Sequence, residues 1–138
     1  MTAGSSPKGQ TYGYIFNHCR FIGSEPNTCY LGRPWREYAK VVILNSEIGD
    51  HIKPEGWHDW GKIDAHDTVY FAEYKNYGPG AAGARPSWTH TLTDTEAENY
   101  TYASVFKLIP YSYFCSSFCD DSSFFLDAYH NEYPDPSF

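Results

Sequence analysis

The stretch from Thr28 to Lys40, TCYLGRPWREYAK, contains the residues best suited to chemistry, Arg33 and Trp35. Gly32 frees the backbone before the arginine, and Pro34 holds the residue before it in extended geometry. Arg33 is therefore expected to point in a fixed direction. Trp35 adds a flat apolar face with one N–H donor. A fixed cation beside a flat ring suits a ligand with one flat face and an oxygen-rich edge, such as a carboxylated sugar or a nucleotide.

The chemical role open to Arg33 is electrostatic. A guanidinium group stays protonated in proteins, so Arg33 can be neither a nucleophile nor a base. Beside an aspartate it would lower the pKa of the carboxyl group and fix its rotamer through a bidentate pair. The alternative is a surface salt bridge, which contributes little to stability. Trp35 also has an alternative, because tryptophans of strand-rich proteins are commonly part of the core.

A group of histidines and acids raises the question of a metal site. His51, His58 and His66 lie in a turn-rich stretch with Asp59 and Asp67. Their spacing has no recognised ligand rhythm, so we interpret the histidines as ordinary surface or loop residues and predict neither metal nor cofactor. The sequence also has no Gly-x-Ser-x-Gly elbow and no Gly-rich phosphate loop.

The four cysteines are expected to be free thiols rather than metal ligands or a disulfide framework. Cys115 and Cys119 form a C-x-x-x-C pair, which is not the tight spacing of a zinc knuckle, and Cys19 and Cys29 lie far from them in sequence.

Composition narrows the class of protein. The 138 residues suffice for one soluble domain, and the net charge of −7 argues against nucleic acid and against a polybasic membrane-surface protein. No apolar run approaches the ~20 residues of a spanning helix. The first residues, MTAGSSPKGQ, are not a signal peptide, which leaves a cytoplasmic protein or the later part of a longer secreted chain.

The elements that must position Arg33 are short strands separated by turns. We predict strands over 12–16, 40–44 and 67–74, with no helices between them that would form βαβ units. Asn17 and Asn45 each follow an apolar run, at a separation in the range of solenoid repeats. This faint repeat indicates a parallel β-solenoid, and a small antiparallel sheet is the alternative.

One short helix is expected near the end of this region. Thr93 and Glu96 fit a capping box, which predicts a helix over 94–102 with Ala97 and Tyr100 on one face. Asn99 begins a glycosylation sequon. Residues 107–138 are rich in Ser, Phe, Tyr and Asp without clear period, and we interpret them as an atypical tail that is either packed through its aromatics or disordered.

With YLGRPW, the sequence resembles the pectinesterase (pectin methylesterase) family. The segments GDHIKPEGW and EYKNYGPGA follow in the order typical of that family, and the likeness covers about Thr2 to Phe106. The resemblance implies an all-β fold, the right-handed single-stranded parallel β-helix of pectin-lyase-like proteins. Residues 1–106 would be the C-terminal coils of that domain.

The resemblance also implies a reaction, the hydrolysis of methyl esters of galacturonate units in pectin. In the family an aspartate attacks the ester, a second aspartate acts as acid and base, and an arginine holds the nucleophile. Arg33 matches that arginine, and Trp35 and Trp57 match tryptophans of the sugar cleft. The family's Gln-Asp-Thr-Leu nucleophile segment and its second aspartate segment do not occur in this sequence.

We therefore expect a pectinesterase of which this chain is the C-terminal portion, with little or no activity alone and with an open solenoid edge that invites aggregation. The alternatives are a non-catalytic carbohydrate-binding remnant and an inert translation product. The resemblance implies methyl-esterified pectin as the partner, an extracellular location, and monomers for intact family members. Because the chain is acidic, we predict a preference for highly methylated pectin over the polyanionic product.

Overall fold

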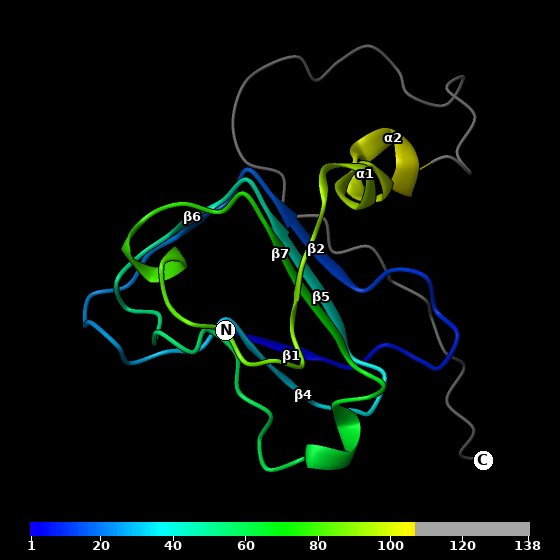
Figure 1. Cartoon of the computed structure of the whole chain (residues 1–138), viewed down its shortest axis with the longest axis horizontal. Helices are drawn as coiled ribbons and strands as arrows, with labels where there is room; N and C mark the ends of the chain where they lie inside the picture. The colour runs from blue at the N-terminus through cyan, green and yellow to red at the C-terminus, as the bar shows by residue number, and fades with distance from the viewer. Residues whose placement is uncertain (107–138) are drawn as a thin grey trace, which may run out of the picture.

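The chain folds into stacked turns whose three sides are short parallel sheets, as Figure 1 shows nearly end-on. The structure, a computed structural model, describes residues 1–106, and the prediction for the segment 107–138 lies outside these residues.

The strands form three sheets, and every strand pair is parallel. The first sheet contains β1 (Thr2–Gly4) and β4 (Gly32–Pro34). The second contains β2 (Tyr14–Asn17), β5 (Lys40–Leu44), β7 (Tyr70–Tyr74) and β8 (His90–Thr91) in that order. The third contains β3 (Arg20–Phe21) and β6 (Glu47–Ile48).

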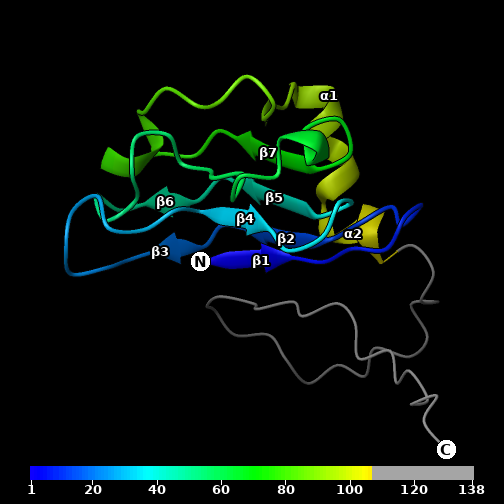
Figure 2. The same ribbon diagram turned by 90° about the horizontal axis from the view of Figure 1, so that it is seen from below.

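Each turn of the stack takes a similar length of chain. Thr2 pairs with Gly32, a separation of 32 − 2 = 30 residues, and Tyr14 pairs with Val41, a separation of 41 − 14 = 27 residues. Figure 2 shows the layers from the side, with β1, β2 and β3 in the first and β4, β5 and β6 in the second. Parallel pairing on three sides at this spacing is the architecture of a parallel β-helix, so the predicted fold class is confirmed.

Within the second sheet, β5 is buried on both faces, which explains its unbroken apolar run. Val41 and Ile43 pack inside the solenoid with residues such as Leu31 and Phe71. The alternate residues of β5, with Ala72, Leu92 and Ala97, form a second cluster on the outer face. Alternation along a strand sends successive side chains to opposite faces, so both faces need apolar residues.

A helical segment covers the outer face of this sheet. It comprises α1 (Asp94–Ala97), η3 (Glu98–Tyr100) and α2 (Tyr102–Val105), which Figure 2 shows beside the stacked strands. The predicted capping box is confirmed, but the single helix predicted over 94–102 is wrong. Thr101 has an extended ψ of 156° and caps α2, so it separates two helical pieces. The connections between strands contain two single 3-10 turns, η1 (Ile63–Ala65) and η2 (Pro79–Ala81). Within residues 1–106, no helix is long and apolar enough to span a bilayer.

The predicted repeat of Asn17 and Asn45 is present, but the two asparagines differ by one position in the register of the stacked strands. Asn45 Nδ2 donates to Asn17 Oδ1 at 2.9 Å, so the two side chains do contact each other. The positions that stack in register are instead His18, Asn45 and Lys75, each with positive φ at the end of its strand. The repeated feature is therefore a left-handed turn residue, a conformation that asparagine tolerates better than most residues.

Candidate functional site: an arginine within an aromatic patch

Arg33 projects outward from the middle of β4. Gly32 and Pro34, its neighbours, are buried, whereas Arg33 is exposed. Gly32 is needed for close approach rather than for backbone freedom, because an added Cβ would lie 2.9 Å from Cζ3 of Trp57. The extended strand fixes the direction of the arginine, as predicted from the proline.

Two aromatic rings lie beside the guanidinium group of Arg33, and a third packs against one of them. The Cζ atom of Arg33 lies 5.9 Å from the ring centroid of Tyr30 and 5.8 Å from that of Trp60. Trp35 packs at a tilt against Trp60, with ring centroids 5.5 Å apart. Trp35 is 51% exposed and Trp60 45%. We call Tyr30, Arg33, Trp35 and Trp60 the aromatic patch.

Lys62 holds the backbone of this patch in place. Its Nζ donates to the carbonyl oxygens of Trp35 at 2.6 Å and Pro34 at 3.2 Å, and it lies 5.4 Å from the ring centroid of Trp60. The Trp60 backbone has a φ of 59°, and its N–H donates to Nδ1 of His58 at 2.8 Å. The loop after Trp57 is therefore tied to the strand that carries Arg33.

Arg33 makes no ion pair and no hydrogen bond through its side chain with any part of the chain that the structure describes. Its contacts there are with ring faces, which attract a cation by about 0.5–2 kcal/mol. Within residues 1–106, the five N–H donors of the guanidinium group are therefore open to an anionic or oxygen-rich ligand.

Trp57 lies inside the solenoid. It is 2% exposed, stacks on Phe71 with centroids 4.8 Å apart, and donates its indole N–H to Glu73 Oε1 at 2.8 Å. The predicted contact of Trp57 with a sugar stays a prediction, since this geometry gives the ring core neighbours. Trp57 does adjoin the patch, because its backbone bridges Gly32.

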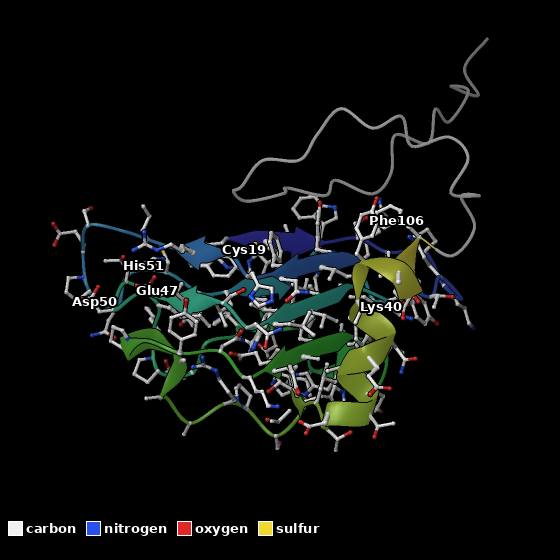
Figure 3. The ribbon with its side chains drawn as sticks, turned by 90° about the horizontal axis from the view of Figure 1, so that it is seen from above. Cys19, Lys40, Glu47, Asp50, His51 and Phe106 are labelled. Atoms are coloured by element: carbon white, nitrogen blue, oxygen red, sulfur yellow. The ribbon has the colours of Figure 1, made fainter. Side chains whose placement is uncertain are left out.

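The histidines have individual packing roles. His51 lies in a turn, as interpreted, but it is buried at 3% exposure rather than on the surface. Figure 3 shows it near Asp50 and Glu47 at one side of the stacked layers. His66 Nε2 lies 3.1 Å from Asp59 Oδ2. A hydrogen bond from the Gly61 N–H, with His66 nearby, lowers the pKa of Asp59. Among residues 1–106, no three His, Cys, Asp or Glu side chains could hold a metal ion together.

The two cysteines within residues 1–106, Cys19 and Cys29, are free. Burial raises the pKa of the Cys19 thiol, which favours its protonated form. Cys115 and Cys119 lie outside the described residues.

Sequence reasoning missed two charged residues close to the patch, Glu73 and Arg85. Their side chains are 13% and 15% exposed and form an ion pair at 2.7 Å. The signal was a glutamate within an apolar strand, YFAEY, which is rarely buried without a partner. The partner arginine is 12 residues further on, and no local pattern identifies it.

Stacked parallel coils define the class, a parallel β-helix protein, and exposed tryptophans lie beside its exposed arginine. Comparison with known proteins narrows it further. The family model described as Pectinesterase matches residues 1–108, and the chain belongs to the pectinesterase family.

Individual relatives agree with this assignment. The chain is 40% identical to Pectinesterase 2 of Arabidopsis thaliana over 109 residues, covering 71% of this chain. It is 39% identical to Pectinesterase/pectinesterase inhibitor U1 of Solanum lycopersicum over 110 residues, also covering 71% of this chain. The solved structure of pectin methylesterase from carrot has 36% sequence identity and a TM-score of 0.64 over 73% of this chain.

The chain spans only part of these proteins: 19% of the length of each plant relative and 35% of the carrot chain. A second solved structure, pectin methylesterase in complex with a hexasaccharide, has 25% identity and a TM-score of 0.58.

Proposed function

We propose that this chain takes part in the hydrolysis of methyl esters of galacturonate units in pectin, and that the aromatic patch faces the substrate. Residues 1–106 would be the C-terminal coils of a pectinesterase β-helix domain. The family match over residues 1–108 and the likeness to a pectin methylesterase solved with a hexasaccharide support this proposal. Arg33, exposed among aromatic rings without a carboxylate partner in residues 1–106, is the observation that carries it.

The chemistry follows from the charge of Arg33. Ester hydrolysis by an aspartate needs an ionised carboxylate, and a bidentate arginine would both lower its pKa and hold its oxygens in line. Arg33 would supply that effect, whereas Trp35 would stack against a sugar ring of the substrate. In this proposal, Trp57 supports β4, the strand that carries Arg33, from inside the solenoid. The nucleophile is assigned to no residue of this chain.

Carbohydrate binding without hydrolysis is the second candidate. It is favoured because the tryptophans of the patch and Arg33 are in place, while residues 1–106 supply no carboxylate within ion-pair distance of Arg33. A protein with these features would bind pectin and release no methanol.

The proposal also covers the partner of the chain and the place where it acts. Its partner would be methyl-esterified homogalacturonan in the cell wall, outside the cell, with no membrane or nucleic acid involved. The net charge of −7 repels de-esterified, polyanionic stretches, so methylated pectin would be preferred.

Calorimetric titration with methyl-esterified hexagalacturonate tests the role of the patch. Arg33→Gln and Trp35→Ala should each weaken binding by about tenfold, the loss expected for a central contact residue. Arg36→Gln is the matched control, because Arg36 is also exposed and follows three residues later. Equal affinities for all four proteins would contradict the proposal.

A methanol-release assay on the same samples tests hydrolysis directly. Methanol formation above the uncatalysed rate that Arg33→Gln abolishes indicates hydrolysis and contradicts the second candidate. Binding with no methanol agrees with both candidates, because the first assigns the nucleophile to no residue of this chain. Faster release from sparsely methylated than from highly methylated pectin would contradict the predicted preference.

A further inference from the structure

We propose that Glu73 is a positioning residue for the aromatic patch and that it acts through Trp57. Glu73 lies on β7, one turn of the solenoid beyond Arg33, and is not part of the patch. The choice of ligand for the test rests on the proposed function, whereas the structural link from Glu73 through Trp57 to the patch does not.

The carboxylate of Glu73 accepts four hydrogen bonds. Oε1 receives the indole N–H of Trp57 at 2.8 Å and Nε of Arg85 at 2.7 Å. Oε2 receives Nη2 of Arg85 at 3.1 Å and Nδ2 of Asn76 at 3.3 Å. A largely buried carboxylate that accepts this many hydrogen bonds is held in one orientation.

Arg85 extends the link to the chain that precedes Trp57. Its Nη1 donates to the carbonyl oxygen of Pro54 at 2.8 Å, and Nη2 donates to that of Gly80 at 2.9 Å. Gly56, with a φ of 68°, lies so close that an added Cβ would be 2.6 Å from Nε of Arg85. The ion pair therefore fixes both the indole and the backbone just before it.

Trp57 transmits this position to the patch along two routes. Its ring packs on Gly32, the residue before Arg33, and the next N–H, that of His58, donates to the Gly32 carbonyl at 3.2 Å. The chain after His58 leads directly to Trp60, whose ring packs near Arg33. Moving the indole would displace both the strand that carries the arginine and the loop that carries Trp60.

The test compares Glu73→Gln and Trp57→Phe with the native protein. The glutamine places an amide N–H₂ or an uncharged oxygen against Arg85, and the phenylalanine keeps a ring but removes the N–H. Each should weaken binding of methyl-esterified hexagalacturonate by about fivefold and shift the indole N–H resonances of Trp35 and Trp60. The double variant should lose little more than either single variant, because both changes break one link.

Leu44→Ala is the control for general destabilisation, since Leu44 lies in the second apolar cluster on the outer face of the sheet. It should lower stability without changing affinity or these two resonances. The inference is overturned if both resonances stay unchanged in Trp57→Phe, or if Leu44→Ala shifts them equally.

The outcomes also separate this inference from the proposed function. If the native protein does not bind the hexasaccharide but the resonances of Trp35 and Trp60 still shift in the variants, the positioning role stands and the proposed ligand is wrong. Trp57→Phe keeps the test valid should Glu73→Gln fail to fold.

Discussion

At the scale of single residues, His51 stands out in the part of the chain that the structure describes, because its buried ring nitrogens lack hydrogen-bond partners. Its ring is 3% exposed, and neither Nδ1 nor Nε2 has a hydrogen-bond partner. Gly23 and Gly49 leave it space, as an added Cβ at Gly49 would lie 2.9 Å from Nδ1. A buried polar group without a partner loses the free energy of its hydration.

We predict that His51→Leu raises the free energy of unfolding by about 1 kcal/mol, because an apolar side chain of similar size removes two unsatisfied nitrogens. Urea denaturation monitored by tryptophan fluorescence measures the change. His90→Leu, at an exposed position in β8, serves as the control for the same replacement. A loss of stability in His51→Leu would show that the imidazole contributes a favourable interaction.

At the scale of elements, the helical segment is attached by side chains at its start. Thr93 and Glu96 form the reciprocal capping box, with the Thr93 N–H donating to Glu96 Oε2 at 2.8 Å. Asp94 accepts the hydroxyl of Tyr74 at 2.8 Å and lies 3.1 Å from Nζ of Lys75. The Tyr74 and Lys75 contacts lower the pKa of Asp94, and the Thr93 N–H lowers that of Glu96.

These shifts predict that the helical segment loosens in acid. A carboxyl group whose pKa is depressed in the folded state stabilises that state above its unfolded pKa of about 4, and this stabilisation is lost as the pH falls through the folded value. Amide hydrogen exchange should therefore show residues 94–105 losing protection before β5 does as the pH falls below about 4. Simultaneous loss in both elements would contradict the prediction.

Thr93→Ala tests the same attachment at neutral pH. Removing an N-cap hydroxyl costs about 1 kcal/mol, so exchange in 94–105 should accelerate about fivefold while β5 is unaffected. Thr101→Ala, which removes the hydroxyl that accepts from Ser104, should affect α2 alone.

The strands show which elements the sequence could predict. Lys40–Leu44 was predicted with the observed bounds, because both faces are buried and the apolar run is unbroken. The strand predicted over 67–74 begins later, at Tyr70, since Thr68 and Val69 still donate to Ala65 in a turn. The short strands β1, β3, β4, β6 and β8 were not predicted, because stacking on the neighbouring coil, rather than local alternation, defines them.

The candidate site was predictable in part for a similar reason. Arg33 and Trp35 are adjacent in sequence, and their local geometry follows from the glycine and the proline. Trp60, in contrast, lies in a loop far from Arg33 in sequence. Its contact with Arg33 depends on the third coil returning beside the second, and a sequence pattern does not specify that register.

At the scale of the whole molecule, the first coil has an edge that no strand within residues 1–106 covers. Within residues 1–106, β1, β2 and β3 each pair on one side only, with β4, β5 and β6. Figure 2 shows these three strands together at one end of the stack. Tyr14 is 42% exposed there, and an unpaired apolar edge is a template for association.

We predict concentration-dependent self-association through this edge, measurable by analytical ultracentrifugation. Tyr14→Lys should shift the equilibrium toward monomer by about tenfold, because a charge at an edge disfavours strand pairing between chains. Tyr77→Lys, a tyrosine that is 56% exposed elsewhere on the solenoid, is the control and should leave association unchanged. An equal effect of both variants would place the contact outside the edge.

The four tryptophans allow one direct measurement of the central claim, that the aromatic patch around Arg33 binds methyl-esterified galacturonate. In an NMR titration with methyl-esterified hexagalacturonate, the indole N–H resonances of Trp35 and Trp60 should shift together and saturate. That of Trp88, whose ring contacts are with His66 and Phe71 rather than with residues of the patch, should stay in place. Saturable shifts at Trp88 with Trp35 and Trp60 unmoved, or no shift at any indole, would contradict the account.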